Sequence, residues 1–429
     1  MIERLNELAK EVAEFLSAKD YVTVVSHHDA DGITAASIIS HALNRRGIPF
    51  HVTIHSKLTP EVVASVEEPV VFCDMGSAEP ELLEGLEDFA VIDHHRPYGE
   101  LSVPHINPHL AGIDGAFQLS ASCLAYLVSR RMGENFDLSA LALAGAVGDK
   151  QELRDANREI LEEGIREGVL KVSKGLRIGS GDLKDLLLLS HEPYIDGISG
   201  DEDGAEEFLK KIGLEGKKYE ELNEEEVKKL TSAIILKLMD STREEVLKSL
   251  VGEIVWCEGE LLKDIFTLSN VVNACGKLER SGTGVAVCLR DERFLDEALE
   301  LHRKYSMKIV EEVRRATREL SALRFLKYVW VKDEGITGAV AGVLARYVVT
   351  DSPVLALRKV NGTVRISARG NEELVKRGID LGEILRISSR AVGGSGGGHN
   401  IAAGASVPED RIEEFLEIVD ERVGEILSG

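Results

Sequence analysis

Short apolar runs alternate with amphipathic segments along the first third of the chain. The runs are four to six residues long and rich in β-branched residues, which is typical of buried strands. They predict strands at 21–26, 50–55, 70–74 and 90–95, and helices at 33–47, 119–133 and 138–149. Such alternation favours an α/β fold, with an N-terminal doubly wound, mainly parallel sheet in a domain of residues 1–155.

The rest of the chain follows two further patterns. Residues 156–327 are rich in acidic and helix-forming residues and predict a mostly helical insertion, ending in a long connecting helix over 294–325. Residues 328–429 again alternate strands and short helices, which predicts a smaller C-terminal α/β domain. We expect the active-site groove to lie between these two α/β domains.

Composition narrows the class of protein. No apolar run reaches the length of about 18 residues that a membrane span needs, and the five cysteines are scattered without a CxxC pair. We therefore expect a soluble, cytoplasmic protein without a membrane partner, a disulfide framework or a structural zinc. Only two glutamines occur among many Glu, Lys and Arg residues, which leans towards a thermophilic source.

The net charge of −23 argues against a surface covered in non-specific nucleic-acid contacts. Residues 355–392 are an exception, because they contain eight basic and four acidic residues. Such a segment suits an anionic ligand, although a pair of solvated faces is the alternative.

Acidic and histidine side chains gather where the predicted strands end. They are His27, His28, Asp29, Asp31, Asp74, Asp93, His94 and His95, with Asp149 at the end of an apolar helix. Since ligands of open α/β sheets bind at the carboxyl ends of the strands, these groups should converge. So many carboxylates repel one another unless a cation neutralises them, and Asp and His ligands without cysteine suit Mn²⁺ or Mg²⁺. Their number favours two ions that share a carboxylate.

Each motif alone has a structural explanation. Asp29 and Asp74 could cap the segments that follow them, and His94 could be an ordinary core histidine. Asp149 is less easily explained, because a carboxylate at a helix C-terminus opposes the helix dipole. Four coincidences at element ends of one domain favour the metal centre.

These motifs resemble the DHH phosphoesterase superfamily, whose Asp-His-His triplet corresponds to residues 93–95 in IDHH. SHHDADG, CDMGS and GAVGD resemble its other motifs. The resemblance implies metal ligation by Asp29, Asp31, Asp74, His94 and Asp149. It implies that His95 contacts a metal or the scissile phosphate, and that Asp93 supports these groups.

One position departs from the family pattern. Many members carry a metal-binding histidine four residues before the first aspartate of the DxD pair, where this chain has Val25. Either His27 takes that role as a metal ligand, or the site uses fewer nitrogen ligands.

The C-terminal domain supports the same resemblance. GGSGGGHN (393–400) resembles the glycine-rich signature of the DHH-associated domain, and RISAR (365–369) resembles one of its strands. Bare glycine backbone allows N–H groups to approach phosphate oxygens, although such a run alone is more often a flexible turn. The resemblance implies substrate binding by His95, Ser367, Arg369, Gly396, Gly397, Gly398, His399 and Asn400.

Chain length and the helical insertion make the chain most similar to the archaeal RecJ-like single-strand exonucleases. This implies a two-metal exonuclease on single-stranded DNA, or also RNA, in replication or repair, with 3′→5′ polarity expected. Mn²⁺ is the expected ion, and Mg²⁺ and Co²⁺ are alternatives. Two other functions stay open: an oligoribonucleotide or cyclic-dinucleotide phosphodiesterase, and a replisome or repair scaffold that binds a helicase or replication factor.

Overall fold

The computed structural model describes residues 2–333 and 335–428, and the contacts within it divide the chain into two compact units. Unit 1 comprises Met1–Lys174 and Glu253–Tyr305, and unit 2 comprises Gly175–Gly252 and Ser306–Gly429. The chain passes between them inside three elements, which are β6 (Leu170–Leu176), β7 (Val251–Cys257) and α13 (Leu295–Glu319). The domain boundaries expected near residues 155 and 327 stay predictions.

Unit 1 contains a five-stranded sheet in the order β2-β1-β3-β4-β5, in which all neighbouring strands are parallel. This confirms the predicted doubly wound α/β fold. The strands are β1 (Val22–His27), β2 (Phe50–His55), β3 (Val70–Cys73), β4 (Phe89–Ile92) and β5 (His105–Ile106). Sequence patterning missed β5, because two residues are too short for a period to show.

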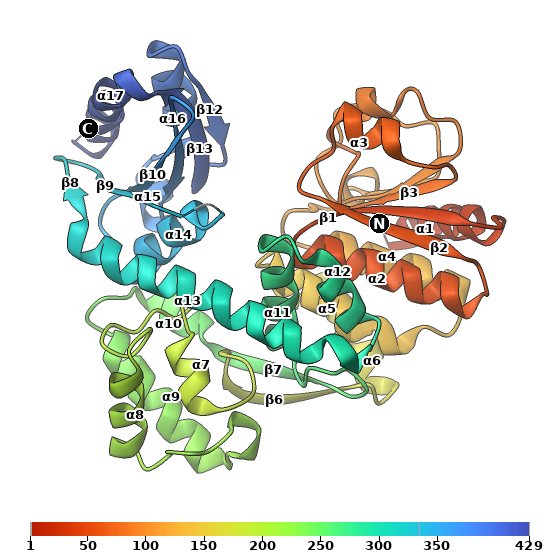
Figure 1. Ribbon diagram of the computed structural model, residues 1–429, viewed down its shortest axis with the longest axis horizontal. Helices are drawn as coiled ribbons and strands as arrows, with labels where there is room; N and C mark the ends of the chain where they lie inside the picture. The colour runs from red at the N-terminus through yellow and green to blue at the C-terminus, as the bar shows by residue number, and fades with distance from the viewer. Residues whose placement is uncertain (1, 334, 429) are drawn as a thin grey trace. The chain divides into compact units, whose positions relative to one another are not determined.

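Both faces of this sheet are buried, as a parallel sheet requires. Alternate strand residues such as Val24, Val71 and Ile92 pack with α1, α2, α4 and α5 in one core. Their neighbours, including Phe72 and Val91, pack on the other face with α3 and the 3₁₀ helix η1 (Figure 1). The helical elements of unit 1 are α1 (Ile2–Ser17), α2 (Ala30–Arg45), α3 (Pro60–Ser65), η1 (Pro80–Leu83), η2 (Pro108–Ala111), α4 (Ala121–Met132), η3 (Phe136–Leu138), α5 (Ser139–Gly148), α6 (Asp155–Arg166), α11 (Ile265–Lys277), α12 (Ser281–Cys288) and η5 (Glu292–Phe294).

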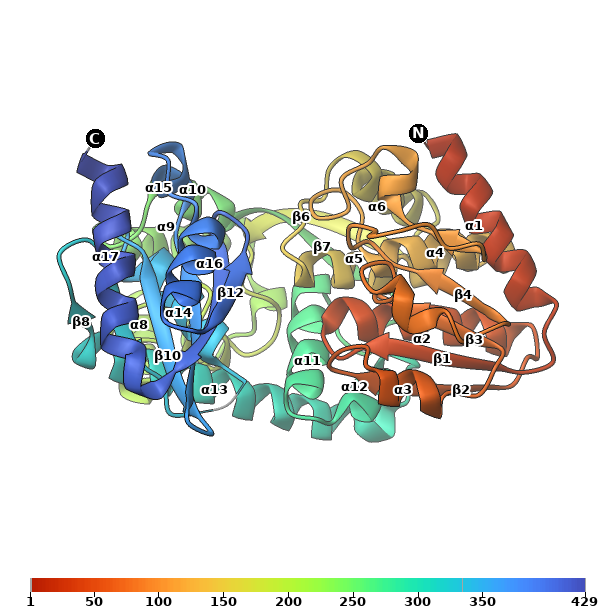
Figure 2. The same ribbon diagram turned by 90° about the horizontal axis from the view of Figure 1, so that it is seen from above.

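Unit 2 contains a six-stranded sheet in the order β12-β13-β11-β10-β9-β8, antiparallel except for the β9–β10 pair. Residues Val364, Ile366 and Ala368 of β11 pack with α16 and α17 on one face (Figure 2). The strands are β8 (Ser321–Ala322), β9 (Lys327–Trp330), β10 (Val354–Val360), β11 (Thr363–Arg369), β12 (Ser395–Gly398) and β13 (Ala402–Pro408).

The predicted helical insertion is mostly helical, although β6 and β7 pair as a two-stranded sheet within it. The helical elements of unit 2 are α7 (Leu183–Leu188), α8 (Glu202–Lys211), η4 (Tyr219–Glu221), α9 (Glu224–Leu238), α10 (Glu244–Ser249), α14 (Thr337–Tyr347), α15 (Glu372–Lys376), α16 (Leu381–Ala391), η6 (Glu409–Arg411) and α17 (Ile412–Ser428). Among residues 2–333 and 335–428, none of the helices has both the length and the apolar character needed to cross a bilayer.

Burial of Phe72 in the middle of β3 generates a stability prediction. Its ring is fully buried and contacts Phe89 edge to face. We expect Phe72→Ala to lower the free energy of unfolding by about 3–5 kcal/mol, because it removes apolar contacts and leaves a cavity. The exposed Phe117 provides the control, since Phe117→Ala should change stability by less than about 0.5 kcal/mol. Denaturant unfolding of both variants measures the difference, and equal losses would contradict the packing described.

Candidate metal centre

Four chain segments bring acidic and histidine side chains to the carboxyl edge of the unit 1 sheet. Strand β1 ends at His27, β3 ends one residue before Asp74, and β4 ends one residue before Asp93. Helix α5 ends immediately before Asp149. The structure therefore brings together all the metal ligands that the sequence predicts, within one unit.

The first cluster joins His27, Asp29 and Asp74. His27 Nδ1 lies 2.8 Å from Asp29 Oδ2 and 3.3 Å from Asp74 Oδ2. Asp29 also caps α2, because its carboxylate accepts the Gly32 N–H at 3.1 Å. The capping and metal-binding explanations of DADG are therefore compatible, since one oxygen accepts the cap hydrogen bond and the other faces His27.

The second cluster surrounds His94. Its Nε2 lies 3.3 Å from Asp74 Oδ1, 3.3 Å from Asp149 Oδ2 and 3.9 Å from Asp31 Oδ2. His94 Nδ1 lies 2.9 Å from the carbonyl oxygen of Gly115, which also accepts from Gln151 Nε2 at 2.9 Å. A proton on Nδ1 satisfies that carbonyl and leaves Nε2 directed at the carboxylates, which is the arrangement found in histidines that ligate metals.

Asp74 lies between the two clusters. It has a φ of 59°, a left-handed conformation that is uncommon outside glycine and recurs at functional sites. Within the part of the chain that the structure describes, its buried Oδ1 accepts no well-aligned hydrogen bond, although His94 Nε2 is 3.3 Å and His95 Nδ1 is 3.8 Å away. A buried carboxylate oxygen without a partner is costly, and a cation would satisfy it.

The donor set fits divalent metal ions. Among the described residues, three groups could each hold one: Asp74, His94 and His95; His27, Asp29 and Asp74; Asp31, His94 and Asp149. Asp74 and His94 each belong to two of these groups. Oxygen and imidazole donors without thiolates suit Mn²⁺ and Mg²⁺. The sharing of ligands suits a pair of ions better than two independent sites.

Asp31 is held rigidly beneath this centre. It is fully buried, and its two oxygens accept the N–H groups of Ala121 at 2.7 Å and Ser122 at 3.0 Å, at the start of α4. A Cβ on Gly145 would lie 2.6 Å from Asp31 Oδ1. The glycine in GAVGD thus makes room for the carboxylate as α5 delivers Asp149.

Asp93 orients His95. The buried Asp93 carboxylate accepts from His95 Nδ1 at 2.8 Å, from the His95 backbone N–H at 3.1 Å and from Ser77 N at 2.8 Å. These contacts hold the pKa of Asp93 below its usual range despite burial, which alone would raise it. The imidazole of His95 is consequently fixed with Nε2 free and about half of its side chain exposed.

Carboxylates raise the pKa of the histidines in the absence of metal. Burial alone would lower the pKa of each histidine, but hydrogen bonds to Asp29 and Asp74 raise the pKa of His27 to about 10. Asp74, Asp31 and Asp149 likewise raise the pKa of His94 well above its ordinary value. Burial also raises the pKa of Asp31 and of Asp149. At neutral pH, protons on the imidazoles therefore offset part of the carboxylate charge.

The centre has two further neighbours, His28, which was expected among the converging groups, and Lys277, which was not. His28 Nδ1 lies 3.1 Å from His27 Nε2, and Lys277 Nζ of α11 lies 3.3 Å from His28 Nε2. His28 was visible as the second histidine of SHHDADG. Lys277 gave no signal, because nothing in its local sequence links it to residues some 250 positions earlier.

Apart from His95, which lies at the metal centre in unit 1, the predicted substrate-binding residues lie in unit 2. Arg369 and Ser367 lie on the face of β11 that carries α14, since a Cβ on Gly338 would be 3.2 Å from Arg369 Nη2 and 3.9 Å from Ser367 Oγ. In the sheet register, Gly404 pairs with both Ser367 and Gly397.

The glycine run is an edge strand rather than a loop. Packing also explains why this strand lacks side chains, because a Cβ on Gly396 would lie 2.9 Å from Ser389 Oγ of α16. Gly397 has nothing within 4 Å of an added Cβ, so its backbone is open. His399 and Asn400 follow this strand, and Gly398 is its last residue. The Asn400 carbonyl accepts from Leu381 N at 3.0 Å.

Known protein families match two parts of the chain. Residues 21–147 match the DHH family, N-terminal domain, and residues 325–425 match the DHHA1 domain. An uncharacterized protein of Methanocaldococcus jannaschii is 31% identical over 448 residues, with 100% of both chains covered. The single-stranded-DNA-specific exonuclease RecJ of Bacillus subtilis is 23% identical over 455 residues, covering 97% of this chain and 47% of the exonuclease. The chain therefore spans about half the length of that relative.

Solved structures share the fold. RecJ of Thermus thermophilus in complex with Mn²⁺ has a TM-score of 0.61 at 20% identity, covering 98% of this chain and 55% of that one. CDC45 of Entamoeba histolytica has a TM-score of 0.65 at 12% identity, and the match covers 98% of this chain and 99% of CDC45.

The raised pKa values predict that metal binding releases protons. Because His27 and His94 carry protons at pH 7.5 without metal, Mn²⁺ must displace them, and its affinity should rise with pH. Calorimetric titration with Mn²⁺ in buffers of different ionisation enthalpy measures this release. We expect His27→Ala to reduce it by about one proton, whereas the exposed His51→Ala should not change it. Binding heats independent of the buffer would contradict the prediction.

Proposed function

Because this chain belongs to the DHH family, whose members are metal-dependent phosphoesterases, we propose that it is a two-metal exonuclease acting on single-stranded DNA. The observation that carries the proposal is the position of Asp74 Oδ1, which is buried between two clusters of carboxylate and imidazole donors and accepts no well-aligned hydrogen bond from the described residues. The sequence similarity to a single-strand-specific exonuclease supports this substrate over a small phosphoester. Single-stranded RNA is an alternative substrate of the same chemistry.

In this proposal each cluster holds one divalent ion. His27, Asp29 and Asp74 would hold the first, and Asp31, His94 and Asp149 the second. Asp74 Oδ1 lies 3.3 Å from His94 Nε2 and could serve both ions. His27 thus takes the role of the histidine absent at position 25. The ions would be Mn²⁺, with Mg²⁺ and Co²⁺ as alternatives; when bound, such a pair activates water and neutralises charge on the phosphoryl oxygens.

His95 would act on the substrate itself. Asp93 holds its Nδ1–H and leaves Nε2 free. Burial alone would lower the pKa of His95, but Asp93 raises it to about 9, so that Nε2 carries a proton at neutral pH. Nε2–H can then donate to an oxygen of the scissile phosphate.

Unit 2 would hold the phosphates of the strand. Arg369 is partly buried, its Nη1 donates to the Ala368 carbonyl at 2.9 Å, and no ion pair to a carboxylate is found for it within the described residues. Next to it, Ser367 and the open backbone of Gly397 leave space for phosphate oxygens. Gly396, Gly398, His399 and Asn400 would complete this surface.

Two exposed aromatic residues lie close in sequence to residues of the metal centre. The side chains of Tyr98 and Phe117 are 75% and 64% exposed. Tyr98 follows the DHH triplet by three residues, and Phe117 follows Gly115, whose carbonyl contacts His94. Exposed rings are costly in water but stack on unpaired bases, which favours a single-stranded substrate.

The alternatives predict different behaviour. A phosphodiesterase for oligoribonucleotides or cyclic dinucleotides would lose activity steeply beyond a few nucleotides. A scaffold would bind a helicase or replication factor without cleavage and would not need the clustered carboxylate and imidazole donors that favour an enzyme. A role in replication or repair, with such a protein as partner and 3′→5′ polarity, completes the proposal.

Hydrolysis of end-labelled single strands tests the activity. With Mn²⁺ we expect stepwise shortening of a long single strand, little action on duplex, and none with EDTA. Asp74→Asn should reduce kcat/KM by more than about 100-fold, because even the loss of groups that support metal ligands costs 10–100-fold. The exposed Asp20→Asn is the matched control. Full activity of Asp74→Asn would exclude this centre as the catalytic site.

Binding of the single strand tests Arg369. We expect Arg369→Ala to weaken binding by about 1.5–3 kcal/mol, since it removes a charged donor to phosphate. The slope of log K against log salt should fall by about 1. Fluorescence anisotropy in Ca²⁺ at several salt concentrations measures both. Arg390→Ala, on the exposed surface of α16, is the control, and an unchanged slope in Arg369→Ala would contradict the assignment.

A further inference from the structure

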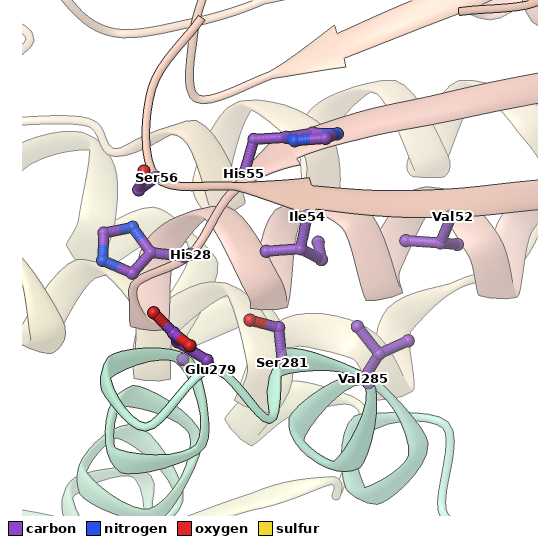
Figure 3. A pocket seen from close by; sticks show the side chains of 10 residues that line it. His28, Val52, Ile54, His55, Ser56, Glu279, Ser281 and Val285 are labelled. Atoms are coloured by element: carbon purple, nitrogen blue, oxygen red, sulfur yellow. The ribbon is translucent and has the colours of Figure 1, made fainter. Parts of the chain in front are cut away.

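A pocket of about 530 Å³ lies beside the metal centre within unit 1. The edge strand β2 and the turn between α11 and α12 form its two sides (Figure 3). His28 belongs to the pocket and also lies 3.1 Å from His27, so the cavity adjoins the first metal cluster. Its volume is that of a small-molecule site.

The pocket walls differ in polarity. Val52 and Ile54 of β2 face Val285 of α12 and form an apolar part (Figure 3). Glu279 lies towards His28, and Ser281 lies between Glu279 and Val285. A base or other flat apolar group suits the first part. Hydroxyl groups suit the second, because a carboxylate accepts hydrogen bonds from them.

The α11–α12 turn is held firmly against the metal motif. A Cβ on Gly276 would lie 1.6 Å from the carbonyl oxygen of His28, so only glycine permits this contact. Glu279 has a φ of 59°, which turns the chain into α12. Lys277, just before the turn, places Nζ 3.3 Å from His28 Nε2. The same turn thus brings a cation to the metal centre and a carboxylate to the pocket.

We propose that this pocket binds the nucleoside of the terminal nucleotide while Lys277 contacts its phosphate at the metal centre. The proposal rests on the proposed function and names residues that position its substrate. Val52, Ile54 and Val285 would contact the base, and Glu279 and Ser281 the sugar hydroxyls. The Glu279 charge repels a second phosphate, so the pocket takes the uncharged part of the nucleotide. Residues 276–285 lie outside both family-matched ranges.

Equilibrium binding without hydrolysis tests the pocket. In Mn²⁺, we expect adenosine monophosphate to bind at least tenfold more tightly than inorganic phosphate. Ser281→Phe, which fills the pocket, should abolish this difference and leave phosphate binding unchanged. Ser65→Phe, on the exposed surface of α3, should behave as the wild type. Equal affinities of the two probes in the wild type, or an undiminished difference in a folded Ser281→Phe, would overturn the proposal.

Two further variants separate the parts of the site. Glu279→Gln should weaken the binding of adenosine monophosphate several-fold and leave the binding of inorganic phosphate unchanged. The exposed Glu292→Gln is the control. Lys277→Ala should weaken both probes together. A loss of phosphate binding in Glu279→Gln, or none in Lys277→Ala, would contradict the division of roles.

Single strands with a terminal abasic residue link the pocket to turnover. We expect the abasic end to raise KM in the wild type but not in Ser281→Phe. If single strands are hydrolysed but neither the abasic residue nor Ser281→Phe changes KM, the pocket assignment fails and the proposed function stands. If no strand is hydrolysed but mononucleotide binding responds to Ser281→Phe, the pocket stands and the proposed function fails.

Discussion

Electrostatic repulsion among buried carboxylates is the constraint around which unit 1 is built. Asp31, Asp74 and Asp149 lie close to a single imidazole, and burial of such groups is costly unless positive charge compensates them. Raised histidine pKa values supply part of that charge in the free protein. The unpartnered Asp74 oxygen marks where compensation is incomplete, and there a cation stabilises the arrangement most.

The surrounding fold supplies the geometry that this constraint demands. Parallel strands deliver side chains to one edge, while the N-terminus of α4 offers two backbone N–H groups to Asp31. Glycines at 115, 145 and 276 allow backbone and carboxylate groups to approach where any side chain would collide. Close packing thus fixes the ligands before any ion binds, which limits the reorganisation that binding requires.

Much of this was predictable from sequence, for reasons visible in particular residues. Strand periodicity located β1 to β4, and the acids and histidines at their ends identified the centre because parallel strands share an edge. Lys277 and the β2 pocket were not predictable, because they arise from a contact between segments over 200 residues apart with no local pattern. The glycine run at 393–398 was visible, but its edge-strand conformation depends on α16 packing, which no local pattern encodes.

The passage of the chain between the units inside β6, β7 and α13 has a consequence for biosynthesis. Helices α11 and α12 pack against α2, and α11 also packs against α5, yet the ribosome makes them after all of α7–α10. Unit 1 therefore cannot complete its core when residue 174 emerges, although domains generally fold as they are synthesised. Its apolar helix faces stay uncovered until about residue 305 has been added. Unit 1 thus acquires its final form only after most of the chain has been synthesised.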